Sequence, residues 1–230
     1  MKVKDWIYPQ ASEIDTARDL EIIKKYLPEK GLVLDAGGGL GRIAIPLAKL
    51  GLRVVLLDIS KTAINFAKER AKEEGVLDRI DFVEGDVCDL PFPDNHFDLV
   101  LALRDVINFS ADQKRAVEEL IRVLKPNHCL IVSVTNKAFW LTKLERWDYN
   151  LEKIKNILGT KSMLTEKELR NLFKGIKVEK IVGSGYCSGN IPENFITSFD
   201  DFLKIENFVG DDEELKFTCE YLVLIGEKRG

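Results

Sequence analysis

A glycine-rich stretch near the N-terminus, residues 32–41, has the sequence Leu32-Val33-Leu34-Asp35-Ala36-Gly37-Gly38-Gly39-Leu40-Gly41. Its first three residues form a short apolar run, which is typical of a strand buried on both faces of a sheet. Glycines that follow such a strand let the backbone approach a ligand closely, and a helix that follows the turn offers free amide groups to polar atoms. The stretch therefore predicts a ligand-binding turn between a buried strand and a helix.

Strands and helices alternate on both sides of this turn. The further predicted strands cover 53–57, 80–83, 97–103 and 129–134. The predicted helices cover 12–26, 43–50, 60–74 and 110–124, the last of which would begin with a capping box of Ser110 and Gln113. Alternation of this kind favours a doubly wound α/β fold with a parallel sheet, whose ligands bind beyond the carboxyl ends of the strands.

The regular alternation of predicted strands and helices ends after Thr135. Two more strands are predicted over 176–182 and 217–227, and helices over 137–158, over 196–208 and after the capping box of Thr165 and Glu168. We expect one domain over 1–230, with an N-terminal helical cap at 1–30. Segments 136–175 and 185–215 are expected to be lid or substrate insertions.

Composition narrows the class of protein. The chain has 230 residues and a net charge of −4, which does not favour a nucleic-acid substrate, because binding to a phosphate backbone usually needs a basic face. No apolar run reaches the roughly 18 residues that span a bilayer, and the N-terminus lacks a signal-peptide pattern, so a cytoplasmic protein is expected. The four cysteines are scattered and there are two histidines, so no metal site is expected.

An acidic residue, Asp58, ends the second predicted strand of the alternating series. A carboxylate at this position can accept two hydrogen bonds from the vicinal hydroxyls of a ribose. The glycine turn and Asp58 together indicate a ligand that contains adenosine. They do not say which one, because Gly39 to Ala44 also satisfies the dinucleotide pattern G-x-G-x-x-A. An NAD(P)-dependent oxidoreductase is therefore an alternative.

A third turn, Gly85-Asp86-Val87, follows the next predicted strand. Asp86 can accept a hydrogen bond from an adenine amino group, and the amide of Val87 can donate to a ring nitrogen. These groups would suit the adenine ring of the same ligand.

Five motifs occur in order along the chain: Val33 to Arg42, Leu57-Asp58-Ile59-Ser60, Gly85-Asp86-Val87, Phe97-Asp98-Leu99-Val100 and Glu119 to Pro126. From about Val33 to Val134 the chain thereby resembles the class I S-adenosylmethionine-dependent methyltransferases of the small-molecule type. Its last two predicted strands resemble the terminal hairpin of that family. The resemblance implies a mostly parallel, seven-stranded sheet with one antiparallel strand.

The resemblance also implies roles for individual residues. Asp35, Gly37 and Gly39 would lie against the methionine part of S-adenosylmethionine, and Asp58 would bind its ribose. Ile59, Asp86 and Val87 would surround the adenine, and Leu103 would offer its carbonyl near the amino group. Gly38 departs from the family, which more often has cysteine or serine there.

The implied reaction is an in-line transfer of the methyl group to a small-molecule acceptor. A general base is needed only if the acceptor arrives protonated. Asp105 is the candidate base, and a structural acid is an equally good interpretation of it. Arg18, on the first predicted helix, is a candidate residue for binding the carboxylate of the methionine part. A non-catalytic module that binds S-adenosylmethionine is a third alternative, and the sequence indicates neither the acceptor nor the oligomeric state.

Overall fold

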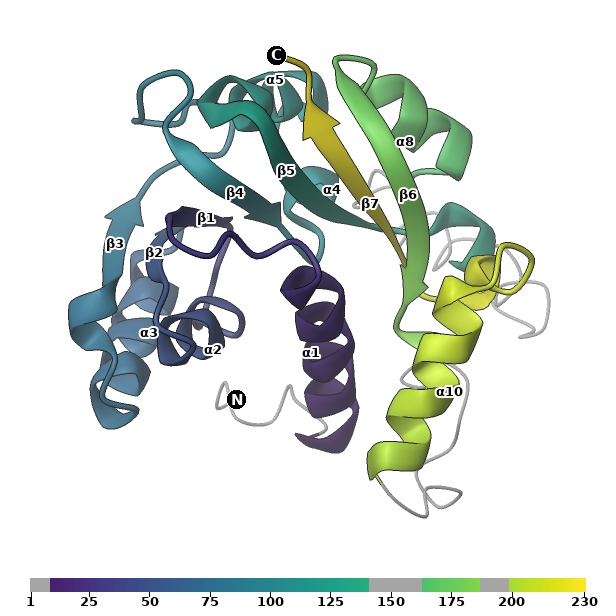
Figure 1. Cartoon of the computed structure of the whole chain (residues 1–230), viewed down its shortest axis with the longest axis horizontal. Coiled ribbons are helices and arrows are strands. Elements are labelled where there is room, and N and C mark those ends of the chain that lie inside the picture. Colours follow the sequence, from purple (N-terminus) through teal and green to yellow (C-terminus); the bar gives the residue numbers. More distant parts are fainter. Residues whose placement is uncertain (1–8, 141–162, 187–198) are drawn as a thin grey trace, which may run out of the picture.

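The predicted strands assemble into one seven-stranded sheet in the computed structural model, which describes residues 9–140, 163–186 and 199–230 (Figure 1). The strands are β1 (Leu32–Ala36), β2 (Arg53–Asp58), β3 (Ile80–Glu84), β4 (Phe97–Ala102), β5 (Leu124–Thr135), β6 (Ile176–Ser184) and β7 (Tyr221–Lys228). Their order is β3-β2-β1-β4-β5-β7-β6. Strands β1 to β5 pair in parallel, and β7 runs antiparallel to both β5 and β6. The doubly wound sheet with one antiparallel strand is thus confirmed.

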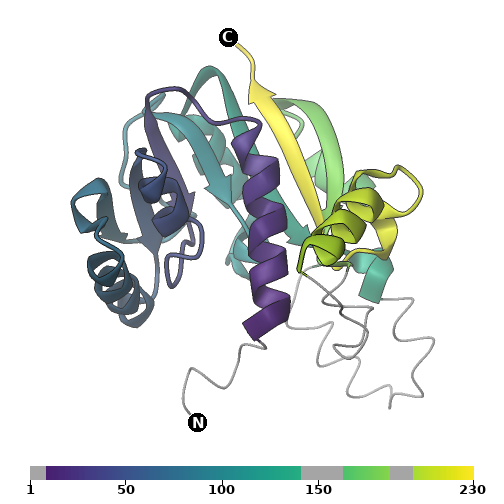
Figure 2. The ribbon, with the colours of Figure 1, turned by 60° about the horizontal axis from the view of Figure 1, so that its bottom comes forward.

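Helices cover both faces of this sheet (Figures 1 and 2). They are α1 (Pro9–Lys24), α2 (Ala44–Lys49), α3 (Lys61–Glu73), α4 (Val106–Phe109), α5 (Gln113–Val123), α8 (Glu166–Leu172) and α10 (Phe199–Asp211). Helices α1, α2 and α3 pack on one face, α5 and α8 pack on the other, and α10 lies beside α1 and β6. Short 3₁₀ turns occupy Leu77–Arg79 and Lys216–Thr218.

The sheet is buried on both sides because its side chains alternate between two cores. Val33 belongs to the core under α1, α2 and α3, whereas its neighbour Leu34 belongs to the core under α5 and α8. Successive side chains of a strand point to opposite faces, so a strand covered on both sides needs apolar residues at every position. This explains the unbroken apolar run that precedes the glycine turn.

Two of the predicted helix starts are confirmed. Ser60 caps α3, where its hydroxyl accepts a hydrogen bond from the amide of Ala63 over 3.2 Å. Thr165 and Glu168 form the predicted capping box at the start of α8. Side-chain oxygens at these positions satisfy helix amides that have no intrahelical partner.

The predicted start at Ser110 is wrong. Asp112 caps α5 instead, and its carboxylate accepts from the amide of Arg115 over 3.0 Å. Ser110 follows the short helix α4, and its hydroxyl donates to the carbonyl of Ile107 over 2.8 Å. The capping pattern could not show that a separate helical turn precedes Ser110 and already engages its hydroxyl.

The C-terminal third contains the remaining differences. Strand β7 begins at Tyr221 rather than at 217, because Lys216–Thr218 forms a 3₁₀ turn. Most of the helix predicted over 137–158 lies outside the described residues. The described end of segment 136–175 is α8, whose Leu169 packs in the core under α5, so this part covers the sheet. None of the described helices has the length and apolar character needed to cross a membrane.

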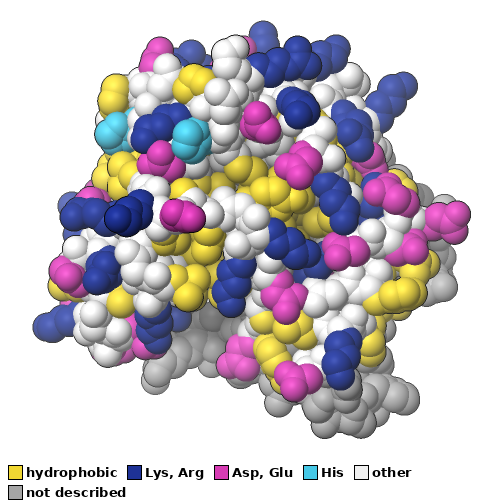
Figure 3. Space-filling view, viewed as in Figure 1, with side chains coloured by type: hydrophobic (Ala, Val, Ile, Leu, Met, Phe, Trp, Pro, Cys, Tyr) yellow, Lys and Arg dark blue, Asp and Glu magenta, His cyan; other side chains and the backbone are white. Residues whose placement is uncertain are grey.

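The surface on the side seen in Figure 1 has charges of both signs. Lysine and arginine side chains are interspersed with aspartate and glutamate, and hydrophobic side chains gather in the middle of the face (Figure 3).

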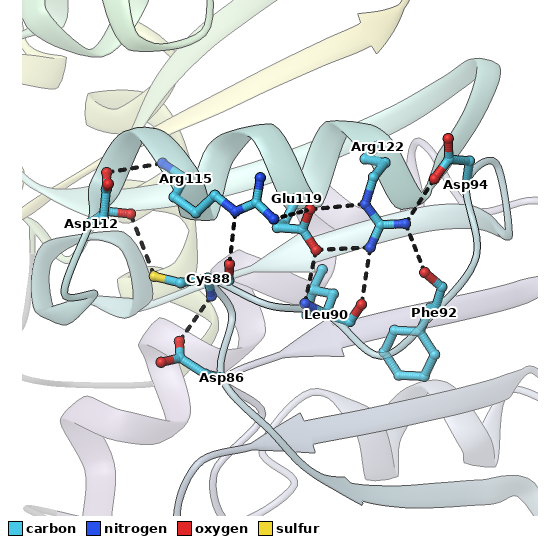
Figure 4. A network of polar contacts seen from close by, with 9 residues as sticks. All are labelled: Asp86, Cys88, Leu90, Phe92, Asp94, Asp112, Arg115, Glu119 and Arg122. Carbon is cyan, nitrogen blue, oxygen red and sulfur yellow. Dashed lines mark hydrogen bonds and ion pairs between the residues drawn. The ribbon is translucent and has the colours of Figure 1, made fainter.

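The loop between β3 and β4 is held against α5 by an ion pair (Figure 4). The Arg122 guanidinium donates to both carboxylate oxygens of Glu119, over 2.9 and 2.8 Å, and to the carbonyls of Leu90 and Phe92, over 3.0 and 2.8 Å. Glu119 is 2% exposed and also accepts from the amide of Leu90 over 2.9 Å. A bidentate pair of this kind has a defined geometry. It therefore fixes the loop that carries Asp86.

We predict that Glu119→Ala lowers the free energy of unfolding by about 3 kcal/mol, because it removes the buried carboxylate that pairs with the Arg122 guanidinium and accepts from the Leu90 amide. Chemical denaturation measures this difference. The matched control is Glu118→Ala, since Glu118 pairs with Lys114 on the exposed side of the same helix, and its effect should stay within about 0.5 kcal/mol.

The effect of Glu119→Ala should also depend on pH. The hydrogen bonds from Arg122 hold the pKa of the Glu119 carboxyl below its ordinary value. A carboxyl with a lowered folded pKa stabilises the protein above its unfolded pKa, and this contribution is lost as the pH falls through the folded pKa. The difference between wild type and Glu119→Ala should therefore shrink in acid, and a constant difference would contradict this role of the ion pair.

Candidate functional site

A cavity of about 340 Å³ lies at the carboxyl ends of β1 to β4. It is lined by Gly37, Leu57, Asp58, Ile59, Gly85, Asp86, Val87, Arg104, Asp105, Val106, Phe109, Ser110 and Ala111. This volume is within the range of small-molecule sites in proteins. The cavity brings together five of the predicted ligand-binding residues, namely Gly37, Asp58, Ile59, Asp86 and Val87, with the candidate base Asp105.

The glycine turn forms one wall of the cavity. The amides of Gly37 and Gly38 both donate to the carbonyl of Leu57, over 2.7 and 3.1 Å, so the turn lies against the end of β2. Gly37 has a φ of +70°, and a Cβ added to it would lie 2.4 Å from a methyl carbon of Val106. Only glycine combines this backbone conformation with so close an approach of α4. The backbone of the turn can therefore be reached by a ligand.

Asp58 connects the turn to the next helix. One of its carboxylate oxygens accepts from the amide of Gly39 and the other from the amide of Ser60, each over 2.8 Å. A carboxylate oxygen has two lone pairs, so each can accept a further hydrogen bond from a ligand hydroxyl. The structure thus gives Asp58 two roles, because it holds the turn and lines the cavity.

The third predicted turn supplies the far end of the cavity. The Asp86 carboxylate accepts from the amide of Cys88 over 2.8 Å, and Val87 is nearly buried. Two large apolar side chains that line the cavity, Ile59 and Phe109, are 72% and 60% exposed. Exposed apolar surface beside polar groups suits a flat heterocyclic ring.

Asp35 lies behind the turn rather than on the cavity surface. It is 3% exposed, and its carboxylate accepts from the amide of Ala44 at the start of α2 over 3.1 Å. Burial raises the pKa of Asp35 to about 6. Of the other predicted residues, Leu103 is buried in the core, and Gly39 contributes through its amide to Asp58. Direct contacts of Asp35, Gly39 and Leu103 with a ligand stay predictions.

Two consecutive residues after β4, Arg104 and Asp105, have left-handed backbones, with φ values of 61° and 69°. The Asp105 carboxylate accepts a short hydrogen bond from the Thr135 hydroxyl. The Arg104 guanidinium lies 4.2 Å from the centre of the Tyr221 ring. Non-glycine residues in this conformation concentrate at functional sites.

The stretch from Leu103 to Asn108, expected after the fourth predicted strand to border the methyl group, supplies Arg104 and Val106 to the cavity. Sequence reasoning missed Phe109, although its position shortly after that strand was a usable signal. It was wrong about Arg18. This side chain is 1% exposed and points to α10, where it donates to Asn207 over 2.6 Å and to Asp211 over 2.7 Å. No group of three or more potential metal ligands occurs among the described histidine, cysteine, aspartate and glutamate residues.

Comparison with known families gives a match to the methyltransferase domain over residues 34–132. Among curated proteins, the ubiquinone/menaquinone biosynthesis C-methyltransferase UbiE of Pseudomonas fluorescens is 40% identical over 106 residues. That alignment covers 44% of this chain and 40% of the relative, so the chain spans less than half the length of this relative.

Solved structures show the same fold over nearly the whole chain. A SAM-dependent methyltransferase of Methanosarcina mazei is 25% identical, with a TM-score of 0.64, and the match covers 90% of this chain and 97% of that one. A protein of Pyrococcus horikoshii, 20% identical, matches all of both chains with a TM-score of 0.69 and shows the fold alone.

The family match over residues 34–132 covers the five motifs except for Val33, and its range includes every residue that lines the cavity. The antiparallel β7 completes the sheet expected of the same family. Neither finding favours an NAD(P)-dependent oxidoreductase. Residues 34–132 therefore match the methyltransferase domain, and together with the sheet topology this match supports a class I S-adenosylmethionine-dependent methyltransferase.

Proposed function

We propose that this chain binds S-adenosylmethionine in the cavity and transfers its methyl group to a small-molecule acceptor. The observation that carries the proposal is the arrangement of Gly37, Asp58, Ile59, Asp86 and Val87, which line one cavity at the ends of neighbouring strands. The family match over residues 34–132 supports it.

The order of the strands suggests how the ligand lies. Strands β3, β2, β1 and β4 are adjacent in that order, so the cavity extends from Asp86 past Asp58 and the glycine turn to Arg104. Adenine would lie between Ile59 and the Asp86-Val87 turn. The ribose would bind Asp58, and the methionine part would pass Gly37 toward the end of β4, near Leu103. The open glycine backbone and the exposed apolar side chains fit such a ligand.

The chemistry places modest demands on the protein. S-adenosylmethionine supplies an activated methyl group on a sulfonium, and the chain has to align the acceptor with it and exclude water. Asp105 lines the cavity beside the expected position of the methionine part. Its hydrogen bond with Thr135 fixes the carboxylate in place, which suits a base for a protonated acceptor and also a purely structural acid.

Residues outside the matched range 34–132 would determine which acceptor binds. The relative named above methylates carbon by its name, but its alignment covers only 40% of its length, so its acceptor is not transferred to this chain. We propose that the N-terminal cap at 1–30, the part of segment 136–175 that precedes α8, and the segment 185–215 form the acceptor side of the site. Parts of all three lie outside the described residues.

We also propose the cytoplasm as the compartment of this protein. Among the described cysteines, Cys88 and Cys129 are free thiols, which fits a reducing environment.

The first test is Asp58→Ala, which should weaken binding of S-adenosylmethionine and S-adenosylhomocysteine by about tenfold or more, because it removes the ribose acceptor and the anchor of the turn. Titration calorimetry with these two ligands and with NAD measures the change. Asp81→Ala is the control, since Asp81 lies on neighbouring β3 and pairs with Arg53 on the surface.

An unchanged dissociation constant in folded Asp58→Ala would contradict the role of Asp58. Binding of NAD alone by the wild type would overturn the proposed function. A panel of small acceptors, with S-adenosylhomocysteine formation as the readout, distinguishes an enzyme from a non-catalytic binding module.

The second test concerns pH. Because burial raises the pKa of Asp35 to about 6, this carboxyl is neutral below that pH and negative above it. S-adenosylmethionine has a sulfonium and an ammonium group, so its affinity should increase as the pH rises through about 6. Asp35→Asn keeps an acceptor for the Ala44 amide and should abolish this increase in calorimetric titrations. The same increase in wild type and variant would contradict the assignment.

A further inference from the structure

A buried carboxylate on α1 joins three parts of the chain at the carboxyl edge of the sheet. Asp19 is 2% exposed. It accepts from the guanidinium of Arg42 over 2.8 Å, from that of Arg104 over 3.1 Å and from the hydroxyl of Ser184 over 3.0 Å. Arg42 follows the glycine turn, Arg104 follows β4, and Ser184 ends β6. One side chain of the N-terminal helix thus contacts both segments that flank the cavity wall at β1 and β4.

Asp19 is held in its ionised form. Burial alone would raise the pKa of this carboxyl, but the charges of Arg104 and Arg42 outweigh burial and hold the pKa below its ordinary value. A buried charge is tolerated only when it is paired and hydrogen-bonded, and Asp19 meets both conditions. The two guanidinium groups in turn depend on this shared partner.

The cavity wall at the end of β4 needs such support. Arg104 and Asp105 have left-handed backbones, a conformation that is unfavourable for residues other than glycine and persists only where the surroundings enforce it. The Arg104 amide donates to the Ser133 hydroxyl over 2.6 Å, and its guanidinium also pairs with Asp15 over 3.4 Å. The guanidinium also donates to the buried Ser184 hydroxyl over 3.3 Å, and Asp19 is its buried acidic partner. Asp19 therefore fixes the direction in which the Arg104 side chain points.

We propose that Asp19 is a positioning residue of the ligand site, through which α1 holds the wall that receives the amino-acid part of the ligand. This inference rests on the proposed function, since the amino-acid part is placed at β1 and β4 because adenine and ribose are assigned to Asp86 and Asp58. Without the charge of Asp19, Arg42 and Arg104 lose the anion between them. Their repulsion then displaces Arg104, while the adenosine end of the cavity keeps its structure.

Two ligands test whether the effect of Asp19 is confined to the amino-acid part of the ligand. S-adenosylhomocysteine has the complete amino-acid part, whereas 5′-methylthioadenosine has the same adenosine and a thioether but no amino or carboxyl group. Calorimetry on the full chain should show that Asp19→Asn weakens the binding of S-adenosylhomocysteine by about tenfold or more. The binding of 5′-methylthioadenosine should weaken by less than about threefold. A general loss of folding would weaken both ligands alike.

The matched control is Asp211→Asn. Asp211 pairs with Arg18, which neighbours Asp19 on α1, and this pair ties the same helix to α10 away from the cavity. Asp211→Asn should change the affinity for S-adenosylhomocysteine by less than about threefold, although it also loosens α1.

Arg104→Gln provides a second variant, which keeps the proposal testable if Asp19→Asn does not fold. It should reproduce the selective loss of S-adenosylhomocysteine. In the double variant the two losses should be clearly less than additive, because both changes break one contact.

The outcomes are distinguishable. If the wild type binds neither ligand, the proposed function fails, and this inference fails with it. If the wild type binds both, the inference is overturned by an unchanged affinity of Asp19→Asn for S-adenosylhomocysteine. It is likewise overturned by equal losses for the two ligands, or by an equal loss in Asp211→Asn.

Discussion

The amides of Gly37 and Gly38 share the carbonyl of Leu57, and this contact presses the glycine turn against the end of β2. Val106 packs on the other side of the turn, so closely that a Cβ on Gly37 would overlap it. The rest of the site depends on this close packing. It brings the amide of Gly39 to Asp58 and sets the width of the cavity between the ends of β1, β2 and β4.

Energetically unfavourable groups surround the glycine turn. Asp35 is buried behind the turn with a raised pKa, and Arg104 and Asp105 have strained backbones beside it. These groups would bind a ligand that has a cationic centre and a zwitterionic end, because buried charges and fixed dipoles bind such a ligand more strongly than exposed charges do. The stability lost here is supplied elsewhere, by two apolar cores and by paired charges such as Glu119 and Arg122.

Residues far from the cavity therefore take part in shaping it. Glu119 and Arg122 belong to a motif that was recognised only by resemblance, and the structure gives its physical reason: the pair fastens the loop that presents Asp86 and Val87. Asp19 does the same for the opposite wall from α1. The glycine turn lies between these two sets of contacts. The Glu119–Arg122 pair acts through the backbone of the loop that carries Asp86, and Asp19 acts through the side chain of Arg104.

The sequence by itself determined the features that depend on near neighbours in the chain. These include the buried strands, the glycine turn, the capping box at Thr165 and the position of Asp58 at a strand end, because periodicity, turn chemistry and parallel-sheet geometry are local rules. Only the tertiary structure decided the partners of Arg18, Asp19 and Arg104. Asp19 bonds to Ser184 across 165 positions of sequence. Such pairs depend on which strand ends meet α1, and no local pattern encodes that meeting.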